Sequence, residues 1–116
     1  IRQCDFEWYA HVRVGAAAGL TAVEIEALHS GQAAPSFSGV ERAVHQVVCE
    51  VATSRDLSDR SYEVAQSVLG QVALNELIVL VGYYDLLELL LSGWRTPLPA
   101  GEASPFAERS ASAAAE

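Results

Sequence analysis

The chain has 116 residues, a formal charge of −8 and 51% hydrophobic residues, and all seven of its basic residues are arginine. This length fits one domain with a modest core. Because neutralising phosphates requires a basic face, the composition argues against nucleic-acid binding and against anionic membrane surfaces. Two cysteines, Cys4 and Cys49, are too few for a disulfide framework or a thiolate zinc site, so we expect no metal.

The first third of the chain carries two signals of helix ends. A first helix is predicted from about Gln3 to Ala18, and Gly19 follows where a left-handed C-terminal cap would fall. Thr21 and Glu24 have the spacing of a capping box, in which each side chain bonds the other residue's backbone N–H. This box predicts a second, short helix that ends at Gly31.

The remaining elements also indicate helix. Ser38 and Glu41 form a second capping box, which predicts a helix that continues to about Ser54. A turn at residues 56–58 leads into a fourth helix, and the last predicted helix covers about Val72 to Gly93. No segment shows the alternation of a strand. The predicted fold class is therefore all-α.

The last predicted helix contains leucine on nearly every face. The run from Leu74 to Leu91 raises a transmembrane question, but acidic residues such as Asp85 and Glu88 interrupt it and are costly in hydrocarbon. A helix that is apolar all round finds too little partner surface inside so short a chain. We therefore expect a homo-oligomer without membrane attachment; the alternative is a helix central to its own bundle.

The composition divides the chain into a helical domain, residues 1–95, and a tail, residues 96–116. The tail is rich in proline, serine and alanine and has little apolar surface to bury. We expect it to be disordered or to lie over a neighbouring subunit. Unpaired cysteines and the lack of a signal-peptide pattern favour a cytoplasmic location.

The densest set of reactive side chains is in the first predicted helix. Cys4, Glu7 and His11 are spaced i, i+3 and i+7, so they share one face, beside Trp8. A carboxylate next to an imidazole holds the ring in one tautomer, and the pair can move a proton. A nearby thiol can be held as thiolate by an imidazolium. The alternative interpretation is a common exposed Glu–His pair that contributes little.

Two residues near the last helix are further candidates for the site. Tyr84 interrupts the apolar helix, and its hydroxyl needs a partner, which can lie on the first helix. Arg95 can bind a substrate carboxylate through two parallel hydrogen bonds, or form an ion pair between subunits. With Trp8, these two are the predicted substrate-binding residues.

The chain resembles the carboxymuconolactone decarboxylase family, which shares its helical fold with the AhpD-type alkylhydroperoxidases. The resemblance covers about residues 4–99 and rests on the order and spacing of several pieces. These are Phe6-Glu-Trp-Tyr-Ala-His11, Gly19-Leu-Thr21, Val23-Glu-Ile-Glu-Ala-Leu28, Glu41-Arg-Ala-Val44, Glu50 and Leu80-Val-Gly-Tyr-Tyr84. It implies an AhpD-like helical bundle, a trimer or hexamer, and one or two helices before residue 1.

The same resemblance bears on the chemistry. AhpD-type members carry Cys-x-x-Cys-x-x-x-His, whereas this chain keeps Cys4 and His11 and places Glu7 at the second cysteine. A carboxylate cannot resolve a sulfenate, so the two-thiol peroxidase cycle is lost. The decarboxylases act on a carboxylated lactone in aromatic catabolism. Their reaction requires proton transfer beside a carbonyl and a cationic side chain that binds the substrate carboxylate, for which Arg13 and Arg95 are the candidates.

Three functions follow, in order of preference. The first is a cofactor-free lyase or isomerase that acts on a small lactone or carboxylate, with Glu7 and His11 as acid and base. The second is an AhpD-like alkylhydroperoxidase, with peroxiredoxin-type activity at Cys4. The third is a non-catalytic oligomer in which Glu7 and His11 only tie helices together.

Overall fold

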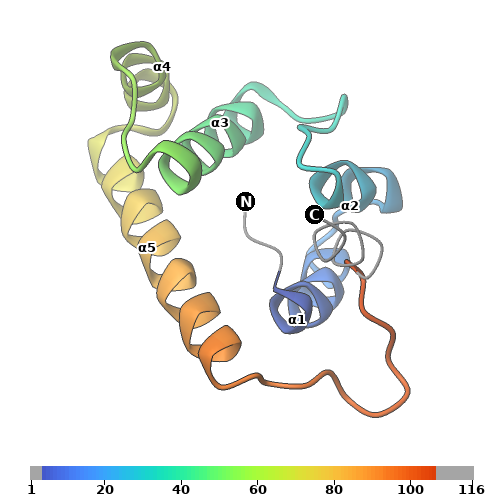
Figure 1. Ribbon diagram of the computed structural model, residues 1–116. Helices are drawn as coiled ribbons and strands as arrows, with labels where there is room; N and C mark the ends of the chain where they lie inside the picture. The colour runs from blue at the N-terminus through green and yellow to red at the C-terminus, as the bar shows by residue number, and fades with distance from the viewer. Residues whose placement is uncertain (1–3, 107–116) are drawn as a thin grey trace, which may run out of the picture.

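The computed structural model describes residues 4–106, and every regular element in that range is a helix. The helices are α1 (Asp5–Ala17), α2 (Ala22–His29), α3 (Gly39–Ser54), α4 (Asp59–Leu69) and α5 (Gln71–Gly93). Figure 1 shows α3, α4 and α5 on one side of the molecule and the pair α1 and α2 on the other. The all-α prediction is confirmed for the described residues.

The predicted helix-end signals are present. Thr21 and Glu24 make both bonds of a capping box at the start of α2, and Ser38 and Glu41 do the same at the start of α3. Gly19 follows α1 with a φ of +106°, a conformation that glycine adopts without the steric cost of a Cβ. Local sequence therefore sets where these helices begin and end.

The hydrophobic core is small and lies where α3, α4 and α5 meet. Val47, Ala65 and Leu74, one from each of these helices, are almost fully buried. Partly buried side chains from the same helices and the turn before α4 surround them: Val51, Leu57, Leu69, Leu77 and Ile78. Burial of apolar surface is the force that holds this three-helix unit together.

The helices α1 and α2 pack against each other without burying any residue completely. Gly15 of α1 leaves room for the side chain of Leu20, in the connection to α2, because a Cβ at position 15 would lie only 3.0 Å from it. The segment that joins the pair to α3 is better covered, with Ala34 and Phe37 buried. Apolar burial therefore stabilises α1 and α2 much less than it stabilises α3, α4 and α5.

After α5 the chain runs back to α1 and α2 (Figure 1). Glu102 forms an ion pair with Arg13 of α1, with 3.2 Å between the charged atoms. The carbonyl of Pro105 lies 3.2 Å from Nε2 of His29 in α2. We call residues 96–106 the strap. We expected the tail, residues 96–116, to be disordered or to lie over a neighbouring subunit. Its first part, the strap, lies against its own chain, and residues 107–116 lie outside the described residues.

One face of α5 is left uncovered. Its large side chains are spaced by three, four or seven residues and are 36–72% exposed: Val72, Val79, Tyr83, Leu86 and Leu90. At 100° per residue this stripe lies on the far side of α5 from buried Leu74. Among the described residues no single helix is long and apolar enough to span a membrane; α4 and α5 pass that test only as a pair bent by 119°.

Candidate active site

A cleft of about 450 Å³ lies between α1 and α5. Five of the six predicted site residues line it: Cys4, Glu7, Trp8, His11 and Tyr84. The first four come from α1 and the residue before it, and Tyr84 comes from the middle of α5. Helical spacing places the α1 residues on one face, and the tertiary packing turns that face toward α5.

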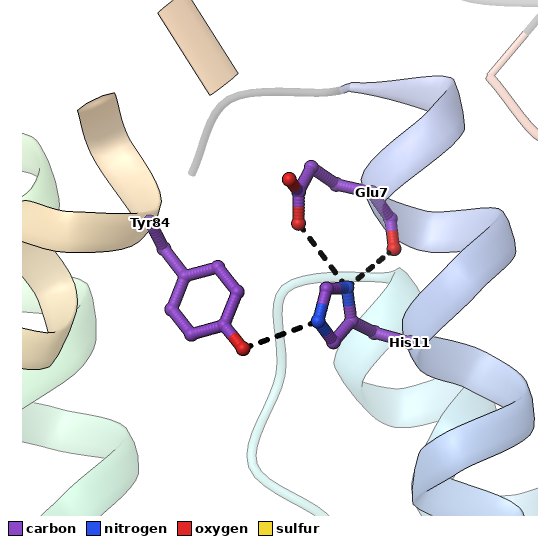
Figure 2. A network of polar contacts seen from close by, with 3 residues as sticks. All are labelled: Glu7, His11 and Tyr84. Atoms are coloured by element: carbon purple, nitrogen blue, oxygen red, sulfur yellow. Dashed lines mark hydrogen bonds and ion pairs between the residues drawn. The ribbon is translucent and has the colours of Figure 1, made fainter. Parts of the chain in front are cut away.

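His11 is the centre of a polar network (Figure 2). Its Nδ1 lies 2.8 Å from the backbone carbonyl of Glu7 and 3.1 Å from the Glu7 carboxylate. Both neighbours are acceptors, so we assign the proton to Nδ1, which donates to them. In the neutral ring Nε2 is then an acceptor, and the Tyr84 hydroxyl, 3.2 Å away, donates to it. The imidazole of His11 therefore lies between the carboxylate of Glu7 and the hydroxyl of Tyr84.

The network is only partly shielded from solvent. The Glu7 side chain is 19% exposed and that of His11 is 46% exposed. The Tyr84 ring meets the His11 ring edge-on, with 5.1 Å between centroids. This packing fixes the plane of the imidazole, while the exposure of His11 leaves room for a small molecule to reach it.

Cys4 lies at the N-cap of α1 and lines the same cleft, half-buried. The other cysteine differs. The Cys49 thiol lies 3.6 Å from Nε2 of His45, and burial raises its pKa, which favours the neutral thiol. Cys49 therefore behaves as a small apolar side chain.

The strap completes one wall of the cleft with Phe106, a residue that the sequence analysis did not single out. Its ring stacks on the His29 ring, 4.9 Å between centroids and 9° between planes, and meets the edge of Trp8 at 6.0 Å. The sequence held one signal for this contact: Phe106 is the lone aromatic residue in a tail rich in proline, serine and alanine.

Arg95 does not join the other predicted site residues. It lies beyond the end of α5, exposed, in a left-handed conformation with a φ of +53°, and it does not line the cleft. Arg13 is the other candidate for binding a substrate carboxylate. It donates to the Tyr9 carbonyl, lies over the Tyr9 ring and pairs with Glu102. Neither guanidinium lies in the lining.

Two acidic residues of α5, Asp85 and Glu88, line the cleft and were not predicted to do so. Asp85 pairs with Arg55 at 2.6 Å, and this hydrogen bond raises the pKa of the guanidinium. Glu88 accepts a hydrogen bond from Ser92. The sequence marked both only as breaks in an apolar helix, because the side of α5 that faces α1 is set by tertiary packing.

A second hollow of about 460 Å³ lies between α3 and α4. Glu50 and Arg60 line it together with small polar and apolar residues, and its lining contains no histidine, cysteine or tyrosine. The cleft between α1 and α5 holds all three residue types. It is therefore the better candidate for an active site.

Comparison of the chain with protein-family models, with curated proteins and with solved structures finds no match. Within residues 4–106 no group of three or more histidine, cysteine or acidic side chains is arranged to hold a metal ion.

Proposed function

We propose that the protein is an acid–base enzyme, a lyase or isomerase that moves a proton next to the carbonyl of a small lactone or carboxylate. The observation that carries this proposal is the contact of one imidazole with a carboxylate on Nδ1 and a tyrosine hydroxyl on Nε2, at the edge of a cleft. Such a chain of groups supplies a base, a residue that orients it and a hydrogen-bond donor. This chemistry needs no cofactor.

Each of the three residues has a distinct task in this reaction. Nε2 of His11 takes a proton from the carbon beside the carbonyl, and the electron pair of that C–H bond moves onto the carbonyl oxygen. For this step the Tyr84 hydroxyl leaves Nε2, which frees the nitrogen lone pair, and donates its one hydrogen bond to the enolate oxygen that develops. The Glu7 carboxylate accepts from Nδ1–H and stabilises the imidazolium. Return of the proton to another carbon completes an isomerisation.

The residue pattern supports the same proposal. The Glu7-Trp-x-x-His11 arrangement and the surrounding pieces resemble the carboxymuconolactone decarboxylase family, whose reaction also needs proton transfer beside a carbonyl. We propose that the chain has the AhpD-like helical bundle of that family. The helical content of the described residues agrees with it.

Self-association is part of the proposal. The exposed stripe on α5, with Val72 and Val79 each more than 70% exposed, has the three- and four-residue spacing that pairs helices in coiled coils and bundles. A second copy of the same stripe would cover it, as in a symmetric homodimer contact. We therefore propose a homo-oligomer that uses this face of α5.

One observation favours a second function, a one-cysteine peroxidase. Cys4 lines the same cleft as His11. In that reaction the thiolate attacks the O–O bond of a hydroperoxide, forms a sulfenate and releases the alcohol, and an external thiol must then reduce the sulfenate. Because Glu7 stands where a second thiol would be needed, this cycle depends on that external reductant.

The decisive experiment measures deuterium uptake beside the carbonyl of a panel of lactones and carboxylates, in D₂O, with wild type, Glu7→Gln and Cys4→Ser. We expect Glu7→Gln to slow uptake by about 10²–10⁴-fold, as is typical when a proton-transfer group is lost. Cys4→Ser should leave uptake unchanged. Glu26→Gln, an exposed acid of α2 outside the cleft, is the matched control.

Two other results would contradict the proposal. Consumption of hydroperoxide with a dithiol, abolished by Cys4→Ser but not by Glu7→Gln, would identify the peroxidase instead. A Glu7→Gln variant that only melts at a lower temperature, with no deuterium uptake by any variant, would indicate the non-catalytic oligomer.

A further inference from the structure

The strap connects the end of α5 to the surface of α1 and α2 (Figure 1). It contains no helix or strand, and none of its residues is fully buried. At its start the Thr96 N–H bonds to the Leu91 carbonyl of α5, and further on a bond from the Glu102 N–H to the Pro99 carbonyl closes a turn. A segment without a regular ladder of backbone hydrogen bonds and without a buried side chain moves at lower cost than a packed helix.

The far end of the strap is attached to α1 and α2 by contacts of three kinds. The Glu102 carboxylate pairs with Arg13 of α1 at 3.2 Å, and these side chains are 41% and 55% exposed. The Pro105 carbonyl accepts a hydrogen bond from Nε2 of His29 in α2, and the Phe106 ring stacks on the same imidazole. Because water competes for the ion pair, this attachment is readily broken and made again.

The attached end of the strap is also a wall of the cleft, through Phe106. The rings of Trp8, His29 and Phe106 each contact the other two, with 4.9–6.0 Å between centroids. Trp8 precedes His11 by three residues on α1, so the ring that Phe106 meets lies one helical turn from the reacting imidazole. Movement of Phe106 away from α1 and α2 therefore opens the cleft beside Trp8 and exposes its indole ring.

We infer that the strap is a gate of the cleft. Its release from α1 and α2 moves Phe106 out of the wall and admits a small molecule to the side of the cleft at Trp8, and the ion pair of Arg13 with Glu102 closes it again. This inference goes beyond the proposed function, because it concerns access and holds for either reaction proposed for the cleft. Salt screens exposed charges, so the gate opens more at high ionic strength.

Quenching of Trp8 fluorescence by acrylamide tests this inference without requiring turnover. The second tryptophan, Trp94, is 72% exposed beyond α5, so a Trp94→Phe background leaves Trp8 as the single reporter. Acrylamide is small and uncharged, so its quenching measures entry into the cleft and not attraction to the altered charges. We expect Glu102→Arg, which replaces attraction to Arg13 by repulsion, to raise the quenching constant about twofold or more at low salt.

A charge swap shows whether the ion pair is the cause. The Arg13→Glu, Glu102→Arg double variant restores opposite charges, so its quenching constant should lie below that of either single variant. Glu63→Arg makes the same change of charge at an exposed position of α4, away from the cleft and the strap, and should leave the quenching of Trp8 unchanged.

Salt and removal of the ring separate the two parts of the gate. In the Trp94→Phe background, quenching of Trp8 should increase as sodium chloride is raised from about 0.02 M to about 1 M, whereas a Glu102→Gln variant should show little dependence on salt. Phe106→Ala should increase quenching at every salt concentration, because it removes the ring itself. An unchanged far-ultraviolet circular dichroism spectrum shows in each case that the helices are intact.

Two results would overturn the inference. One is the same quenching constant for the Trp94→Phe background, Glu102→Arg and Phe106→Ala, which would show a fixed wall. The other is a charge-swapped variant that is quenched at least as strongly as both single variants, which would show that the ion pair does not close the strap. Failure of the proton-transfer proposal looks different, because deuterium uptake is then unaffected by Glu7→Gln while the quenching of Trp8 still responds to the strap.

Discussion

The helices α3, α4 and α5 bury side chains against one another, whereas α1 and α2 bury none completely. On the first side, a valine, an alanine and a leucine form a closed contact. On the second, the contacts are polar or aromatic: the ion pair of Arg13 with Glu102, the stacking of His29 on Phe106, and the bond between His11 and Tyr84. Apolar burial therefore stabilises α3, α4 and α5 more than the polar and aromatic contacts stabilise α1 and α2.

This difference has a meaning for the site. The residues proposed for proton transfer, Glu7 and His11, lie on the weakly buried side, and Tyr84 lies on the helix that belongs to the core. A cleft between a rigid unit and a less stable helix pair can change its width at low cost, as substrate-binding regions often do. Four predictions test this comparison, from the largest expected effect to the smallest.

The largest effect is expected in the three-helix core. Leu74→Ala removes a fully buried side chain and should lower the free energy of unfolding by about 2–5 kcal/mol, through lost burial and the cavity left behind. Leu89→Ala, on the same helix but 51% exposed, should cost less than about 1 kcal/mol. Urea denaturation measures both. An equal loss for both would show that an assembly covers the exposed side of α5.

The second effect concerns the strap. Phe106→Ala removes two ring contacts, with His29 and Trp8, that are each worth about 0.5–1.5 kcal/mol in comparable pairs. We expect faster amide hydrogen exchange in α1 and α2 and unchanged exchange in α3 to α5. A uniform increase over all five helices would instead show that the two sides unfold together.

A smaller effect on stability is expected at the contact between the two sides. Tyr84→Phe removes the hydroxyl that lies 3.2 Å from His11 and should lower the free energy of unfolding by about 1 kcal/mol or less, because both residues are exposed. The same variant should slow deuterium uptake by about tenfold or more, since the enolate loses its donor. Tyr83→Phe, next to it on α5, is the matched control.

The smallest effect is acid sensitivity at the helix ends. The Ser36 hydroxyl is the main group that lowers the pKa of Glu24 below 4.5, and the Ser38 backbone N–H does the same for Glu41. Because both pKa values are depressed in the folded state, their contribution is present above about pH 4.5 and is lost as the pH falls below it. Glutamine also completes a capping box but has no carboxylate to protonate. The melting temperature of the Glu24→Gln, Glu41→Gln double variant should therefore fall less between pH 7 and pH 3 than that of wild type. An equal loss in both proteins would contradict this assignment.

Much of the local structure could be predicted from the sequence. The capping boxes at Thr21 and Ser38 and the glycine after α1 define helix ends through bonds between residues close in the chain. The grouping of Cys4, Glu7 and His11 also followed from spacing, because a helix fixes which side chains share a face. The sequence analysis expected the Tyr84 hydroxyl to find a partner on the first helix, and Tyr84 lines the same cleft as these residues.

Other parts of the site depend on how the strap runs back to α1 and α2, and on which side of α5 lies toward α1. Arg95 follows the tryptophan at the end of α5, and nothing local to the sequence shows that this end lies outside the cleft. Phe106 joins the wall only because the strap runs back along α1 and α2. The acidic residues of α5 line the cleft because packing on Val47 and Ala65 fixes the rotation of that helix.

The sequence by itself determined the helices, their ends and the face of α1 that carries the reactive groups, because these depend on hydrogen bonds and spacing within a few residues. The tertiary structure alone decided that this face meets Tyr84, that the walls are apolar, and that the lining described for residues 4–106 contains carboxylates without an arginine. Those features depend on how distant segments pack, and packing is set by burial that is summed over the whole chain.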